Sequence, residues 1–209
     1  MRNIHKNAEP RSLTEHRKKL FADYDNYTDK NTLRQSLIDE QRGLCCYCQA
    51  RIRPSVESMK IEHWRCQDVY PELQLDYRNM LGACLGGHGQ PEDVQHCDTL
   101  KGNSDLCFSP ADPACNVEQK IQFLGDGSIQ SYDLGFDNDM NKVLNLNLKQ
   151  FISNRKAVLT AFQQRLQAGK KLEPLKELPK WDGSQKGDLP EYAQVIVYWL
   201  RKRQARIAK

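Results

Sequence analysis

The sequence predicts an α+β fold in which a small mixed centre lies between helical ends. All eight cysteines fall between Cys45 and Cys115, in a stretch rich in Gly, Pro and Asp that leaves little room for long elements. Apolar residues recur at helical spacing before and after this stretch. We therefore divide the chain into a helical segment (1–43), a cysteine-rich core (44–115) and a hairpin with a C-terminal helical extension (116–209).

Two helices are expected before the cysteines. Ser12 and Glu15 have the spacing of a capping box and predict a short helix that reaches Phe21. A second helix is expected from about Thr32, with an apolar face, and it should end at Gly43 because glycine commonly terminates helices.

The C-terminal third predicts a hairpin followed by two helices. The stretch "KIQFLGDGSIQSY" has strand-like flanks, with residues 125–127 as the turn. Apolar residues at helical spacing predict a long amphipathic helix over residues 146–167, ending at Gly169. The stretch "LEPLKELPKWDGSQKGDLP" is expected to be a loop, and a final helix should carry Trp199.

Composition favours a cytoplasmic protein without a membrane partner. The chain has 209 residues, 39% of them hydrophobic. No apolar run approaches the ~18 to 20 residues that span a bilayer, and the first residues lack the hydrophobic core of a signal peptide. The net charge of +4 is mild and does not by itself argue for nucleic acid. Basic clusters at residues 17–19 and 201–206 are typical of solvated helix faces, and a phosphate-binding role for either cluster is the alternative.

The cysteines predict a structural zinc site, since a reducing compartment disfavours disulfides. The C-x-x-C spacing can direct two thiolates at one ion from a single turn, and two further cysteines flank a polar, glycine-rich loop. The expected ligands are Cys45, Cys48, Cys84 and Cys97. His88 or His96 can replace one of them, and buried or free thiols are the alternative to a zinc site.

The stretch "IEHWR" places Glu62 directly before His63, which offers a metal ligand beside a general base. Asn79 in "LDYRNML" and Asp98 in "HCDTLKGN" complete a constellation of polar residues. Consecutive residues on a regular strand point to opposite faces, so Glu62 either binds the metal or orients a group that does. For His63 alone, a hydrogen-bonded core histidine is the alternative.

The order Cys-x-x-Cys, Glu-His, Asn-x-Leu, Cys, Cys-Asp-x-x-Lys-Gly resembles the HNH endonucleases, whose fold is the ββα-metal finger. The motifs "CCYC", "IEHWR", "YPEL", "LDYRNML", "CDTLKGN" and "LNLNLKQFISNRK", between about Gly43 and Lys156, look like those of the PtuB-like effectors of the Septu and some retron anti-phage systems. The resemblance implies a zinc-stapled ββα-metal (HNH) core flanked by N- and C-terminal helices.

The resemblance also implies roles in phosphodiester hydrolysis. The implied catalytic residues are His63, Asn79, Glu62 and Asp98. His63 would act as general base, and Asn79 would orient it or its loop. Glu62 and Asp98 would bind Mg²⁺ or Mn²⁺, although Asp98 stands where the family usually has His or Asn. Lys101 and Arg65 are expected to contact the substrate.

The family further implies a PtuA-like ATPase partner and a nucleic-acid substrate, with DNA favoured. One alternative is a nuclease that cuts RNA such as tRNA in a retron system. The other is a non-catalytic zinc-finger interaction module, which would keep the cysteines but would not need Glu62, His63 and Asp98 together.

Overall fold

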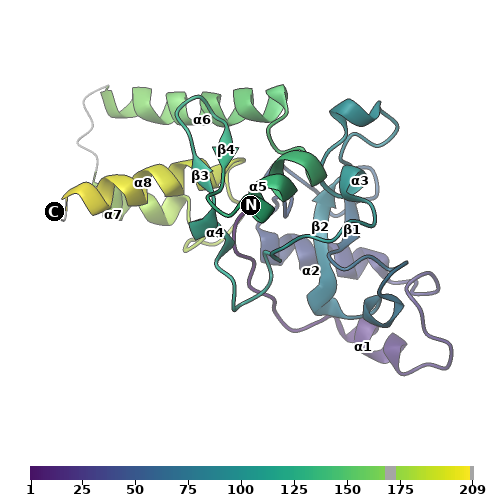
Figure 1. Ribbon diagram of the computed structural model, residues 1–209. Helices are drawn as coiled ribbons and strands as arrows, with labels where there is room; N and C mark the ends of the chain where they lie inside the picture. The colour runs from purple at the N-terminus through teal and green to yellow at the C-terminus, as the bar shows by residue number, and fades with distance from the viewer. Residues whose placement is uncertain (168–172, 208–209) are drawn as a thin grey trace.

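The computed structural model describes residues 1–167 and 173–207 of the chain, and in this part helices surround two small sheets (Figure 1). The α+β fold class is confirmed. The helices and strands, in chain order, are α1 Arg11–Arg17, α2 Lys30–Gln41, β1 Met59–His63, β2 Met80–Cys84, α3 Cys97–Lys101, α4 Val117–Lys120, β3 Gln122–Phe123, β4 Ile129–Gln130, α5 Leu134–Asn138, α6 Lys149–Gln167, α7 Pro174–Glu177 and α8 Ala193–Ile207.

A two-stranded antiparallel sheet forms the centre of the cysteine-rich segment. The register sets Met59 of β1 opposite Cys84 of β2, and His63 opposite Met80. Gly82 lies in a tightly packed part of β2, because a Cβ at this position would lie 2.9 Å from the terminal methyl of Met59 and 3.1 Å from Ile52. The sheet therefore ends with His63 on one strand and with a cysteine on the other.

Helix α2 packs against β2 and confirms the second expected helix. The side chain of Asp29 accepts a hydrogen bond from the backbone N–H of Thr32, which caps the first turn. The helix ends at Arg42 in the left-handed conformation, with φ of 56°, and Gly43 follows with φ of 75°. The predicted glycine stop is thus correct.

Helix α1 is shorter than the sequence predicts, and the capping box is wrong. Ser12 is the second residue of the helix, and its hydroxyl pairs at 2.8 Å with that of Tyr27 instead of capping the backbone. Pro10 occupies the cap position. Phe21 lies beyond the helix, 83% exposed. A tertiary hydrogen bond has replaced the local one.

The expected hairpin is confirmed by β3 and β4, with Gly127 in the turn at φ of 94°. The sequence prediction missed the next element, α5, and the π-helical turn Asp139–Val143 that continues it. These turns bury only Phe136, Asp139 and Met140, which is too few residues to show a helical period.

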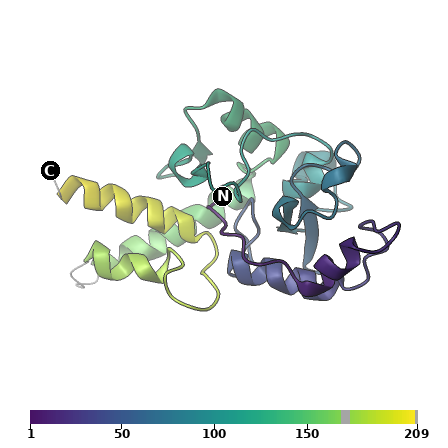
Figure 2. The ribbon, with the colours of Figure 1, turned by 90° about the horizontal axis from the view of Figure 1, so that it is seen from below.

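Helices α6, α7 and α8 lie together at the end of the molecule away from β1 and β2 (Figures 1 and 2). The predicted long helix is confirmed as α6, while its expected end at Gly169 lies outside the described residues. The final helix is confirmed as α8. The expected loop between them is wrong in part, because it contains α7 and a 3-10 turn at Leu178–Lys180.

One main hydrophobic core joins the three expected segments. Ile38, Leu81 and Ile196 belong to the same buried cluster, so the cysteine-rich centre is packed against both its N-terminal and its C-terminal helices. In residues 1–167 and 173–207, we find no helix with the length and the apolar character of a membrane span.

Candidate functional site

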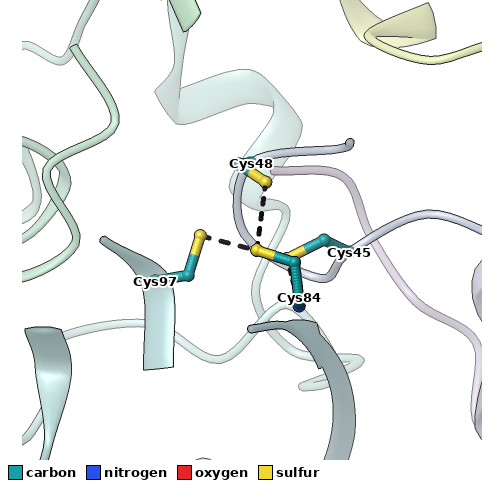
Figure 3. A group of neighbouring side chains, drawn as sticks. All are labelled: Cys45, Cys48, Cys84 and Cys97. Atoms are coloured by element: carbon teal, nitrogen blue, oxygen red, sulfur yellow. Dashed lines mark hydrogen bonds between the residues drawn. The ribbon is translucent and has the colours of Figure 1, made fainter. Parts of the chain in front are cut away.

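Four cysteine thiols meet at one point beside the β1–β2 sheet (Figure 3). Their sulfur atoms all lie within 4.8 Å of one another. The Sγ atoms of Cys45 and Cys97 are 4.0 Å apart, and those of Cys48 and Cys84 are 3.7 Å apart. Zinc–sulfur bonds of about 2.3 Å in a tetrahedron put sulfurs about 3.8 Å from each other. The cluster therefore fits one zinc ion.

The backbone around the cysteines is shaped to present sulfur to a metal. Gln49 adopts the left-handed conformation, with φ of 67°, and this turns the chain directly after Cys48. The N–H of Ala50 lies 3.5 Å from the Cys48 sulfur, and the N–H of Cys84 lies 3.3 Å from the Cys45 sulfur. Such N–H donors stabilise thiolate charge and orient the ligands.

The two histidines considered as alternative zinc ligands differ in placement. His96 is buried, with Nδ1 3.2 Å from the Cys97 sulfur and its ring edge-on to Phe151. His88 is exposed. Among the described residues, the set of closely spaced ligand atoms at this point consists of the four cysteine sulfurs and includes no histidine nitrogen. The geometry favours the four-cysteine set.

Glu62 is held inside the protein by two groups. Its side chain is 2% exposed. Its Oε1 atom accepts a hydrogen bond from the Tyr47 hydroxyl at 2.7 Å and pairs with the Lys101 ammonium at 3.0 Å. Burial raises the pKa of Glu62 well above its usual range, the Asp98 carboxyl raises it further, and Lys101 and Tyr47 oppose these effects. Sequence reasoning missed Tyr47, whose only signal was an aromatic hydroxyl between two zinc-ligand cysteines.

Lys101 faces the protein interior, so the expected phosphate contact does not fit its placement. Its side chain is 1% exposed. Beyond Glu62, its ammonium lies 3.3 Å from the backbone oxygen of His63 and 3.4 Å from that of Gly102. A buried carboxylate requires a counter-charge, and Lys101 provides it. The sequence could not show that this lysine of α3 points inward.

Asp98 stands on α3 directly after Cys97, and its carboxyl neighbours that of Glu62. The Lys60 ammonium lies 3.2 Å from Asp98 Oδ2 and also donates to the Thr99 hydroxyl at 2.7 Å. Burial alone would raise the pKa of Asp98, but hydrogen bonding with Glu62 and the charge of Lys60 hold it below its usual value. One strand and one helix thus bring two carboxyls together.

His63 is fixed at the end of β1 with one nitrogen available. Its Nε2 lies 2.9 Å from the carbonyl oxygen of Gln74, and Tyr24 packs edge-on against the ring at 4.6 Å. Because a carbonyl only accepts, Nε2 carries the proton and Nδ1 keeps its lone pair. Burial lowers the pKa of His63, although Gln74 and Asp98 oppose this effect. The neutral base is therefore favoured at neutral pH.

Asn79 ties together the loop that follows His63. Its Oδ1 accepts from the N–H of Arg65 at 2.8 Å, and its Nδ2 donates to the oxygens of Arg65 and Leu73 at 2.9 and 3.2 Å. The Arg65 guanidinium pairs with Asp105 at 2.7 Å and lies over the ring of Trp64. The amide of Asn79 is thus fully engaged with backbone, and a substrate contact by Arg65 stays a prediction.

Glu62, His63 and Asp98 all line one cleft of about 360 Å³, to which Lys60, Cys66 and Asp68 also contribute. Four consecutive residues of β1, from Lys60 to His63, line this cleft, so the alternation of strand faces does not separate Glu62 from His63 here. Oε1 of Glu62 carries the contacts to Tyr47 and Lys101, Oδ2 of Asp98 carries the contact to Lys60, and the two carboxyls lie within hydrogen-bonding reach of each other. Paired carboxylate oxygens suit a hard divalent cation, so the donor set fits Mg²⁺ or Mn²⁺.

Two known proteins are similar to part of this chain. The Septu protein PtuB of Bacillus thuringiensis is 27% identical over 81 residues, which are 39% of this chain and 28% of the relative. A retron Ec83 putative HNH endonuclease of Escherichia coli is 27% identical over 81 residues, 34% of this chain and 31% of the relative. The matched segment thus spans less than a third of the length of each relative, and no family model matches the chain. Both relatives support the resemblance to the PtuB-like HNH family.

Proposed function

We propose that the protein is a metal-dependent HNH endonuclease that hydrolyses phosphodiester bonds of nucleic acid. In this proposal β1, β2 and α3 make up a ββα-metal core, and zinc on the four cysteines holds its ends together. The observation that carries the proposal is that His63, Glu62 and Asp98 line one cleft, while Nε2 of His63 is engaged by the carbonyl of Gln74. A zinc-binding interaction module has no need of this arrangement.

His63 would act as the general base. Its Nδ1 accepts a proton from the attacking water, while the carbonyl of Gln74 holds the ring through Nε2. The carboxylates of Glu62 and Asp98 would hold Mg²⁺ or Mn²⁺, which when bound stabilises charge on the scissile phosphate and the departing oxygen. Asn79 fixes the loop from which the base projects.

Tyr47 and Lys101 would position the carboxylate of Glu62. Both contact the same oxygen, Oε1, so Oε2 is the oxygen that would face the ion. A ligand held in this way loses little conformational freedom when it binds the ion. Lys101 acts through Glu62 and does not need to touch the substrate.

For the substrate we favour DNA, and for the biological setting an anti-phage defence system with a PtuA-like ATPase partner. The names of the two relatives, a Septu protein and a retron HNH endonuclease, support this setting. An HNH site binds the phosphate and not the base, so the choice of target must come from surfaces outside the cleft or from the partner.

A nicking assay on supercoiled plasmid with Mg²⁺, run with and without the ATPase, tests the proposal. We expect His63→Ala to lower the cleavage rate by about 10²–10⁴-fold, the usual contribution of a general base. The matched control is His88→Ala, because His88 is an exposed histidine outside the cleft. Near-normal cleavage by a folded His63→Ala protein would refute the nuclease and favour the zinc-binding interaction module.

A further inference from the structure

Charge is distributed very unevenly along this chain. Residues 149–209 contain 14 Lys and Arg against 5 Asp and Glu, a net charge of +9. Residues 1–148 contain 17 Lys and Arg against 22 Asp and Glu, a net charge of −5. The mild net charge of the whole chain is therefore the sum of an acidic part, which contains the cleft, and a basic helical extension. Such asymmetry is typical of proteins whose basic part binds a polyanion.

The cleft itself has few cations to offer a polyanion. Lys60 pairs with Asp98, Lys101 is buried against Glu62, and the guanidinium of Arg65 pairs with Asp105. A nucleic-acid substrate presents one negative charge per phosphate, and Lys and Arg contacts to phosphates supply most of the sequence-independent affinity. These three cations are engaged with carboxylates, so a more basic surface elsewhere would supply much of the binding affinity.

The C-terminal half of α8 provides such a surface. Lys202, Arg203 and Arg206 are exposed and share one side of the helix, because residues three and four apart are neighbours on its surface. We name these three residues the basic stripe. Within residues 1–167 and 173–207 none of the three forms an ion pair, whereas the adjacent Arg201 is paired with Glu118.

The basic stripe is accessible, and aromatic rings of the same helix contact two of its side chains. The end of α8 projects away from the rest of the molecule (Figures 1 and 2). The Lys202 ammonium lies 5.7 Å from the ring centre of Tyr198, and the Arg203 guanidinium lies 5.4 Å from that of Trp199. These contacts limit the freedom of two long side chains, which lowers the entropy lost on binding.

We propose that the basic stripe of α8 binds the phosphate backbone of duplex DNA independently of base sequence. The extension would hold the substrate while the cleft acts on a distant phosphate of the same molecule. This inference rests on the proposed nuclease function for its biological meaning. Binding, however, can be measured without cleavage, so the two proposals fail separately.

The test measures binding of a fluorescent DNA duplex to the full chain by anisotropy over a series of salt concentrations. The protein carries His63→Ala and bound zinc, and Mg²⁺ is omitted, so that the duplex stays intact. The stripe variant adds Lys202→Gln, Arg203→Gln and Arg206→Gln. The logarithm of the DNA-binding constant falls linearly with the logarithm of the salt concentration, and each phosphate contact adds about 0.9 to the steepness of this line. For the stripe variant we expect a steepness smaller by about 2 to 3 and an affinity weaker by on the order of 10²-fold at 0.1 M salt.

The matched control removes three exposed cations from the acidic part, as Arg11→Gln, Lys18→Gln and Lys19→Gln. We expect its slope to change by less than about 1, because these residues contact no phosphate. Equal weakening by both variants would show a general charge effect and overturn the proposal. Unchanged DNA binding by the stripe variant would also overturn the proposal. If this variant bound DNA normally but no longer bound the ATPase, the stripe would be a protein-docking surface and the proposal would be wrong.

Discussion

Lys101→Met tests whether the buried ion pair holds Glu62 in place. Methionine keeps the length of the side chain and removes its charge. The Lys101 ammonium lies 3.0 Å from Oε1 of Glu62, and the two side chains are 1% and 2% exposed. Water therefore cannot replace the lost partner. Removing one member of a buried pair costs about 3–5 kcal/mol, and we expect the free energy of unfolding to fall by this amount.

Urea unfolding of the zinc-bound protein, followed by the fluorescence of its 3 tryptophans, measures the effect. The same substitution in a Glu62→Gln background should cost at least about 2 kcal/mol less, because a neutral amide requires no counter-charge. The matched control is Lys18→Met, which breaks an exposed pair with Glu15 whose side chains are 66% and 53% exposed. Such a pair contributes about 0–1 kcal/mol.

A cost below about 1 kcal/mol for Lys101→Met would refute the argument, since it would put the pair in the range of surface pairs. An equal cost in both backgrounds would refute it too. That result would trace the loss to packing of the lysine stem and not to the charge of Glu62.

Three further predictions concern metal and packing. The protein should carry about one zinc per chain by elemental analysis. Cys48→Ser should lower both the zinc content and the stability. The control Cys46→Ser changes a cysteine outside the cluster and should keep the zinc. Asp98→Asn should raise the Mg²⁺ concentration that half-maximal cleavage requires, while Glu62→Ala should raise it only if Glu62 is a ligand. Otherwise Glu62→Ala lowers the rate at an unchanged Mg²⁺ requirement. Leu81→Ala, at a side chain 0% exposed, should cost about 2–5 kcal/mol in urea unfolding, and a cost under about 1 kcal/mol would contradict the packing described for β2.

Local patterns predicted the elements that have a local sequence signal or a periodic apolar face. Helix α2 follows from its apolar face and glycine stop, and the four-cysteine cluster follows from cysteine spacing. The capping box at Ser12 failed because the distant Tyr27 takes the serine hydroxyl. Helix α5 was missed because side-chain bonds stabilise it, among them the cap of Asp133 on Phe136, and not an apolar period.

In the site, the residue types could be predicted from the sequence more easily than the directions in which their side chains point. The residue types pointed to Glu62, His63 and Asp98, and the structure lines one cleft with all three. The inward direction of Lys101 and the bond from Tyr47 to Glu62 depend on how α3 and the cysteine turn pack on the sheet. Residue patterns along the chain do not show such contacts between segments, which is why Lys101 was expected at the substrate and Tyr47 was not expected at the site.

The hydroxyl of Tyr47 has a consequence for protein engineering. Tyr47 stands inside the Cys45–Cys48 turn and bonds the glutamate of the cleft at 2.7 Å. A designer who grafts a different zinc knuckle onto this scaffold, with apolar residues between the cysteines, would preserve the metal and the turn yet leave Glu62 with one partner fewer. The knuckle and the acid must therefore be transplanted as one unit, together with Lys101.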